Sequence, residues 1–144
     1  MTSRTSAIWT RSGSDAERGP CASLAAVGVR RVVPNLFEDD PAAAREFYAG
    51  MFDFDIAMDM GWIATLASPE NRGAQISIFE RDAEQGRDPF VSIEVDDVDA
   101  VHERALALGH DVLYELRDED WGVRRFMVRD PGGRVVNVLS HLTG

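Results

Sequence analysis

Hydrophobic and polar residues alternate along the last third of the chain in the way that β-strands require. Residues 123–129 and 134–140 are rich in β-branched and aromatic side chains, and Asp130-Pro131-Gly132-Gly133 between them is typical of a tight turn. The pattern predicts a β-hairpin. A fainter copy lies about 60 residues earlier, where a turn at 68–73 precedes a strand at 75–79. The chain is therefore predicted to contain a duplicated module.

The front halves of the two modules match as well. Residues 33–48 align with residues 90–105, which places Asp39-Asp40 on Asp96-Asp97. Each aspartate pair precedes apolar residues at helical spacing, so one aspartate of each pair is predicted to cap a helix, and Gly109 is predicted to end the second helix. The apolar stripes are Ala44, Phe47, Tyr48 and Met51 in the first helix and Val98, Val101, Ala105 and Leu108 in the second.

Each module is predicted to run strand, helix and then three strands. The predicted strands are residues 30–37, 55–58, 62–67 and 75–79, followed by 90–95, 111–115, 123–129 and 134–140. Helices on one face of a curved, mixed sheet define an α+β fold around a cavity. Modules at about 29–80 and 87–142 form a single domain over 29–144, and residues 1–28 are predicted to be a flexible extension because they show little periodicity.

Period-two alternation assigns side chains to the two faces of the sheet. The apolar residues Val91, Ile93, Val95, Val136 and Val138 are expected beneath the helices. The residues expected on the concave face are Val33, Asn35, Phe37, Gln75, Ser77, Phe79, Phe90, Ser92, Glu94, Val135, Asn137 and Leu139. This mixture of apolar and polar groups is typical of pockets for organic molecules.

Composition narrows the function classes. The 25 acidic and 15 basic residues give a net charge of −10, which argues against a nucleic-acid or anionic-membrane partner. Every basic residue is arginine, so lysine-based covalent catalysis is excluded. Cys21 is the single cysteine and there is no long apolar run or signal peptide, which together predict a cytoplasmic protein in a reducing compartment.

The chain resembles the vicinal oxygen chelate superfamily, which includes glyoxalase I, extradiol dioxygenases, fosfomycin-resistance thiol transferases and bleomycin-resistance proteins. The segments that carry the resemblance are Phe47-Tyr48, Val95-Asp96-Asp97-Val98 and Arg129-Asp130-Pro131-Gly132-Gly133. The resemblance implies duplicated βαβββ modules. It also implies a divalent metal held by His and Glu side chains on the first and last strands of each module.

The positions that the resemblance assigns to metal ligands do not carry metal ligands here. They fall on Val33 and Phe90, seven residues before the capping aspartates, on Asn137, and on Ser77, or Gln75 if the turn is shorter. None is His, Asp, Glu or Cys, so we predict no metal and no cofactor. Among the histidines, His102 and His110 are expected in a helix and a loop, and only His141 could reach the mouth of the cavity.

Aromatic and charged residues supply the remaining candidates. Trp62 and Trp121 occupy matching positions and could form two flat walls for a planar ligand, or could simply be core tryptophans. One of Arg124 and Arg125 should face the cavity. Glu94, Asp118, Glu119 and Asp120 would suit a cationic ligand, or could pair with neighbouring arginines. The candidate ligand-binding residues are Asn35, Trp62, Gln75, Ser77, Phe90, Ser92, Glu94, Trp121, Arg124 and Asn137.

These observations predict a metal-independent protein that binds a small organic ligand, such as an aromatic natural product or antibiotic that it sequesters. Two alternatives stay open. One is a glyoxalase-type lyase, isomerase or dioxygenase with an atypical site, and the other is a domain that serves only for interaction or dimerisation. A homodimer is expected because open sheets leave strand edges to cover.

Overall fold

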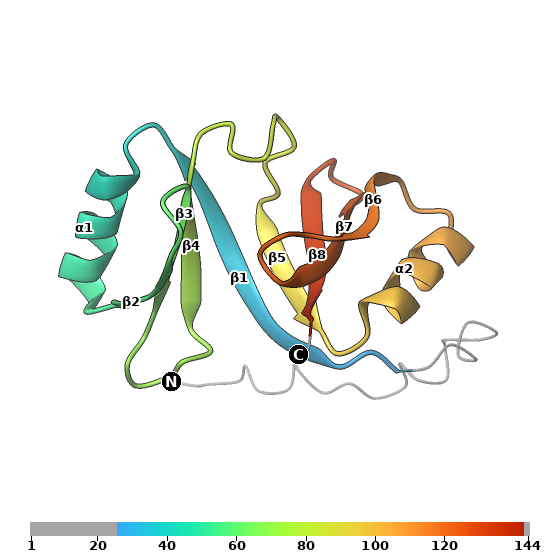
Figure 1. The fold of residues 1–144 in the computed structure, drawn as a ribbon, viewed down its shortest axis with the longest axis horizontal. Helices are drawn as coiled ribbons and strands as arrows, with labels where there is room; N and C mark the ends of the chain where they lie inside the picture. The colour runs from blue at the N-terminus through green and yellow to red at the C-terminus, as the bar shows by residue number, and fades with distance from the viewer. Residues whose placement is uncertain (1–25, 143–144) are drawn as a thin grey trace, which may run out of the picture.

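The computed structural model describes residues 26–142, which form two helices and eight strands in the predicted order (Figure 1). The first module contains β1 (Val29–Glu38), α1 (Pro41–Phe52), β2 (Asp55–Asp59), β3 (Ile63–Ala67) and β4 (Gln75–Glu80). The second contains β5 (Val91–Val95), α2 (Val98–Ala107), β6 (Val112–Asp118), β7 (Val123–Arg129) and β8 (Val135–His141). The α+β prediction is confirmed.

The two modules join edge to edge in one mixed sheet. Its strand order is β2-β3-β4-β1-β5-β8-β7-β6, and the antiparallel pair β1–β5 joins the modules at its centre. Going outward from this pair, β4, β3 and β2 follow β1 on one side, and the equivalent strands β8, β7 and β6 follow β5 on the other. Within each module the first and last strands are parallel, and Asn35 lies opposite Ser77 as Ser92 lies opposite Asn137. The duplication read from the sequence is therefore visible in the register.

Aspartates cap both helices at equivalent positions. The Asp40 carboxylate accepts a hydrogen bond from the backbone N–H of Ala43, and Asp97 accepts one from Ala100, both at 3.1 Å. These contacts satisfy backbone donors that the first helical turn leaves without partners. Gly109 follows α2 with a left-handed φ of 77°, as predicted for a helix end.

The helices pack on the outer face of the sheet at opposite ends of the molecule (Figure 1). Under α2 the core contains Val95, Phe126 and Val138, with Ile93 and Val136 at its margin. Under α1 it contains Ala64, Leu66 and Ile78. Four of the five residues predicted beneath the helices, Ile93, Val95, Val136 and Val138, belong to the core under α2, because alternate strand residues point to one face.

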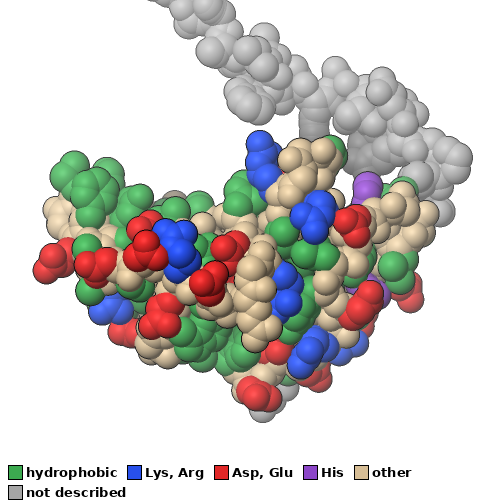
Figure 2. All heavy atoms as spheres, turned by 90° about the horizontal axis from the view of Figure 1, so that it is seen from above, with side chains coloured by type: hydrophobic (Ala, Val, Ile, Leu, Met, Phe, Trp, Pro, Cys, Tyr) green, Lys and Arg blue, Asp and Glu red, His purple; other side chains and the backbone are tan. Residues whose placement is uncertain are grey.

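The predicted apolar stripe of α1 is only half buried. Ala44 and Tyr48 pack on the sheet, whereas Phe47 and Met51 are 54% and 62% exposed. The sheet beneath α1 reaches only one side of the stripe, so the other side remains in solvent. Figure 2 shows hydrophobic side chains gathered at the end of the molecule where α1 lies.

The predicted extension, residues 1–28, lies mostly outside the described residues. Val27 packs against the core under α2, and the Gly28 backbone N–H donates to the Asp96 carboxylate at 3.2 Å, so these two residues are part of the domain. Within residues 26–142, no helix has the length and apolarity needed to cross a membrane.

Candidate functional site

The concave face of the sheet bounds a cavity of about 180 Å³, here called the inner cavity. Strands of both modules contribute to it, so it lies at their junction. Six of the ten candidate site residues line it, namely Asn35, Trp62, Ser77, Ser92, Trp121 and Asn137. The four that do not are Gln75, Phe90, Glu94 and Arg124.

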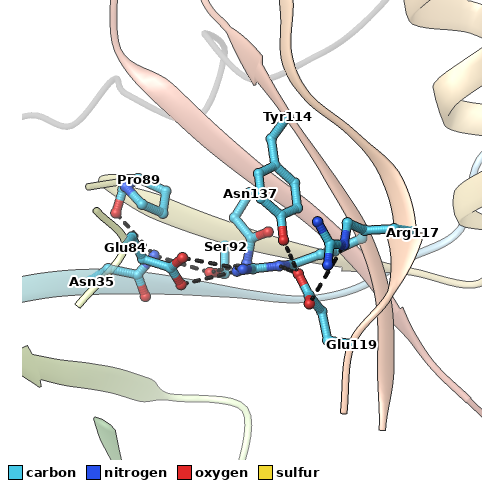
Figure 3. Close-up of polar contacts among 9 residues, drawn as sticks. Asn35, Glu84, Pro89, Ser92, Tyr114, Arg117, Glu119 and Asn137 are labelled. Carbon is cyan, nitrogen blue, oxygen red and sulfur yellow. Dashed lines mark hydrogen bonds and ion pairs between the residues drawn. The ribbon is translucent and has the colours of Figure 1, made fainter. Parts of the chain in front are cut away.

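Asn35, Ser92 and Asn137 form a hydrogen-bonded polar floor in the inner cavity (Figure 3). The Asn35 side-chain amide donates to the Ser92 hydroxyl at 2.9 Å and to the Pro89 carbonyl at 3.1 Å. The Asn137 amide donates to the same hydroxyl at 3.0 Å. The three side chains hold one another in place across the β1–β5–β8 strands.

The polar floor contains unsatisfied acceptors. Asn35 and Asn137 are 7% and 8% exposed, yet the Oδ1 atom of each lacks a hydrogen-bond partner. The Pro89 carbonyl fixes the orientation of the Asn35 amide, so its unpaired group is the oxygen. An unsatisfied buried polar group costs about 1–3 kcal/mol. A donor brought to the floor would recover part of that cost.

The residues at the family's metal-ligand positions do not fit a metal ion. Val33 is apolar, Ser77 shares a hydrogen bond of 2.9 Å with Thr65, and Asn137 can offer only its neutral Oδ1 atom. In the part of the chain that the structure describes, no three His, Cys, Asp or Glu side chains are grouped to bind a cation. A neutral amide and a hydroxyl are too weak a donor set for a divalent ion.

Phe90 does not lie where the sequence placed it. It is 46% exposed and outside the inner cavity, with the Arg134 guanidinium 5.4 Å above its ring. The reason is that β5 begins only at Val91, so Phe90 lies beyond the end of the strand where alternation no longer directs its side chain.

Trp62, Phe79 and Trp121 form an aromatic wall of the inner cavity. The two tryptophan rings meet edge to face, with centroids 5.3 Å apart and planes at 70°, and Phe79 lies 5.9 Å from Trp62. The two tryptophans, which occupy matching positions in the modules, are therefore in direct contact. The idea of two flat walls around a ligand is wrong, because rings in mutual contact leave no space between them. A ligand would pack against one continuous wall.

Of the two adjacent arginines, Arg125 and not Arg124 lines the inner cavity. Arg124 pairs with Asp99 of α2 and with Asp118, both at 2.9 Å, on the outer face. Phe126 is part of the core under α2, so Arg124 at the same parity must also point outward. Arg125 is 4% exposed and lines the inner cavity.

Arg125 forms a buried ionic network with Glu84 and Glu119, both of which are labelled in Figure 3. Its guanidinium binds both carboxylate oxygens of Glu84, at 2.9 and 3.1 Å, and its Nε donates to Glu119 at 2.7 Å. The Tyr114 hydroxyl also donates to Glu119. Burial opposes ionisation of Glu119, but the hydrogen bonds from Tyr114 and Arg125 outweigh it and hold the pKa of Glu119 below its ordinary value.

A second ionic group, formed by Arg31, Glu94 and His141, lies at the rim of the inner cavity. Glu94 accepts from Arg31 at 2.5 Å and from His141 at 2.8 Å, while Gln75 accepts from Arg31 at 2.5 Å. Gln75 and Glu94 therefore contact the cavity only through Arg31 and His141, which line it. Burial opposes ionisation of Glu94, but the hydrogen bonds from His141 and Arg31 together lower its pKa.

Of the two interpretations of these acidic residues, the structure supports pairing with arginines over attraction of a cationic ligand. Glu94, Asp118 and Glu119 are each bound by an arginine, so their charges are compensated within the protein. The cavity residues that sequence reasoning missed are Arg31, Met58, Met60, Ile63, Thr65, Glu84 and Val123, and Arg125 was one of two alternatives of which Arg124 was chosen. Strand parity could have identified Arg125, whereas nothing in the sequence marks Glu84, which lies in the connection between the modules.

The chain is thus a protein of two βαβββ modules that share one sheet and line one cavity between them. The sequence model of the Glyoxalase/Bleomycin resistance protein/Dioxygenase superfamily matches residues 28–138. The chain belongs to this superfamily. No curated protein matches the sequence.

Solved structures share the fold at low sequence identity. One is a glyoxalase/bleomycin resistance protein/dioxygenase superfamily member from Vibrio splendidus 12B01, with 18% identity, a TM-score of 0.59 and 78% and 98% of the two chains covered. Methylmalonyl-CoA epimerase from Mycobacterium tuberculosis has 23% identity, a TM-score of 0.58 and coverage of 81% and 89%. An extradiol ring-cleaving dioxygenase from B. fuscum has 19% identity and a TM-score of 0.60, and the match covers 83% of this chain and 35% of the dioxygenase chain. At these identities the likeness shows the fold.

Proposed function

We propose that this protein binds a small aromatic ligand in its inner cavity without a metal ion. The observation that carries the proposal is the composition of the cavity: an aromatic wall faces a polar floor of neutral side chains at the metal-ligand positions and beside them. Such a mixture binds organic groups through apolar contact and a few oriented hydrogen bonds.

The cavity volume limits what can be buried. Sites that enclose a whole drug-sized molecule measure roughly 300–1,000 Å³, and the inner cavity measures about 180 Å³. A ligand would bury one planar ring system here, with any larger part outside. If the ligand is an antibiotic or another natural product, the protein would hold one aromatic part of it.

Titration with 2-naphthamide tests this function. We expect calorimetry to show one site per chain, with the same affinity in EDTA as in buffer containing Zn²⁺, Ni²⁺, Mn²⁺ or Fe²⁺. Its amide N–H groups can donate to the unpaired Oδ1 atoms of Asn35 and Asn137. Near-stoichiometric metal in the purified protein, together with binding lost in EDTA, would refute the proposal.

The rim supports a second candidate, which is proton transfer without a metal. The ionised Glu94 carboxylate can only accept, so the His141 Nδ1 atom carries the shared proton, and in the neutral form of the ring the lone pair is on Nε2. His141 lines the inner cavity beside Arg31. The Nε2 atom could remove a proton from a carbon next to a carbonyl and return it, while Arg31 stabilises the enolate oxygen.

Phenylpyruvate in D₂O tests this candidate, because its CH₂ group lies next to a carbonyl and its exchange is visible by NMR. Catalysis would appear as deuterium incorporation faster than in buffer, reduced at least about tenfold in His141→Ala and Glu94→Gln. His110→Ala, which changes a loop histidine, serves as the control. Exchange at the buffer rate, or equal rates in all variants, would rule out catalysis and leave the binding function standing.

We also propose that the protein forms a homodimer through the exposed side of α1. Its two helices differ: α2 buries Val98 and Ala105, whereas α1 has no buried residue although it carries Phe47, Met51 and Phe52, each more than half exposed. Apolar surface of this kind is stabilised by burial against a partner.

Sedimentation should show a dimer at micromolar concentration that becomes a monomer in Phe52→Glu. Leu106→Glu is the matched control, since Leu106 is 55% exposed on α2 and its replacement should leave the dimer intact. A wild-type monomer would contradict the proposal.

A further inference from the structure

The aromatic wall also borders a second, larger hollow, here called the outer chamber. It encloses about 630 Å³ and shares Trp62, Glu84, Trp121 and Arg125 with the inner cavity. Because four residues line both spaces, one ligand in contact with the tryptophans can reach into both. The polar residues that line only the outer chamber are Gln85, Arg87, Tyr114, Glu115, Arg117 and Glu119.

Arg87 is a cation in the outer chamber without an anionic partner. Its guanidinium lies 4.7 Å from the centre of the Tyr114 ring, and its Nε atom is buried with no hydrogen-bond partner. Within residues 26–142, no Asp or Glu oxygen lies within 4.0 Å of this guanidinium, while Arg125 holds two carboxylates. A partly buried charge without a counter-charge is costly, so the side chain favours an added anion.

The acidic residues of the outer chamber do not fill this role. Both oxygens of Glu84 bind Arg125, and Glu119 binds Arg125 and Tyr114 and lies 3.8 Å from Arg117. Glu115 is 77% exposed, and its carboxylate lies 3.6 Å from the Nε2 atom of His102. Among the described residues, the chamber therefore combines two buried carboxylates held by arginine, Glu84 and Glu119, with the guanidinium of Arg87, which has no carboxylate partner.

The connection between β4 and β5 holds Arg87 in this position. Asp82, Gln85 and Asp88 in that connection have left-handed φ angles of 67°, 57° and 35°, which L-residues seldom adopt. Such a backbone persists only where surrounding contacts fix it, and the paired Glu84 supplies one such contact. Arg87 thus extends from a connection that is anchored on the second module.

We propose that the outer chamber binds an anionic oxygen group, a carboxylate or a phosphate, on the ligand whose aromatic part lies against the aromatic wall. This inference rests on the proposed function and gives the ligand its class, an aromatic acid. The net charge of −10 does not oppose this choice at the site. Charges beyond about 8 Å are largely screened at physiological salt, so the distant acidic residues act only weakly on an anion beside Arg87.

Three probes with one ring system and different charges test the inference. They are 2-naphthoate, 2-naphthamide and 2-naphthylmethylammonium, with 2-naphthyl phosphate added to separate carboxylate from phosphate. We expect 2-naphthoate or the phosphate to bind about tenfold more tightly than the amide, and the ammonium probe to bind most weakly. The preference for the anion should shrink as salt is added.

Matched variants assign the preference to Arg87. Arg87→Gln should abolish the advantage of the anion and leave the affinity for 2-naphthamide unchanged, whereas Arg87→Lys should retain most of it. Arg72→Gln removes the same charge from an exposed ion pair with Asp55 and should change nothing. Circular dichroism checks that each variant is folded.

The outcomes separate this inference from the function on which it rests. If the amide binds as tightly as both anions, the anion site is wrong while the aromatic site stands. The same holds if the ammonium probe binds most tightly, or if Arg87→Gln weakens all probes equally. If no naphthyl probe binds, both proposals fail.

Discussion

Replacing Arg125 with leucine should lower the free energy of unfolding by about 3–5 kcal/mol. The substitution leaves Glu84 and Glu119, whose side chains are 5% and 7% exposed, without the guanidinium that binds them. A buried carboxylate without a counter-charge costs far more than the ion pair itself contributes. Urea unfolding followed by circular dichroism at pH 7 measures the change.

Two comparisons establish the cause. Arg124→Leu removes the adjacent charge, which pairs on the outer face, and should alter stability little because exposed ion pairs contribute little. Adding Glu84→Gln and Glu119→Gln to the Arg125 variant should restore part of the loss, since the unpaired charges are then gone. A loss below about 1 kcal/mol in the single variant would contradict the prediction.

The second large effect concerns the aromatic wall. Trp121→Ala should weaken 2-naphthamide binding by about 1–3 kcal/mol, which is roughly 5- to 150-fold, because the ligand loses one of the two tryptophan surfaces. Calorimetry gives the affinity. Phe90→Ala is the control, since it removes an exposed aromatic ring that lies outside the inner cavity. Equal effects of the two variants, or no effect of Trp121→Ala, would exclude a role for the wall.

Strand periodicity accounts for what the sequence could predict. Asn35, Ser77, Ser92 and Asn137 lie well inside regular strands, where alternation directs every second side chain to the cavity, and all four line it. Phe90 was misplaced because it lies one residue before β5, beyond the reach of that rule.

Arg125 and Glu84 show two different reasons for a missed residue. The parity of β7 determines which of the two arginines points inward, once Phe126 is recognised as core beneath α2. Glu84 follows no such rule, because its connection has no repeating pattern and long-range contacts with Arg125 fix its position. The hydrophobic pattern of the sequence therefore predicts the strands and the two faces of the sheet. It does not predict which residues of the connection contact those faces.

The register of the paired strands determines how a bound ligand is oriented. In the first module asparagine lies on the first strand and serine on the last, as Asn35 and Ser77, and in the second module the two residue types are exchanged, as Ser92 and Asn137. Two identical halves would present the same groups in both directions, and an unsymmetrical molecule could then bind in either of two equivalent poses. Because the residue types are exchanged, the two poses offer different hydrogen-bond partners. A ligand without two-fold symmetry should therefore bind in one orientation.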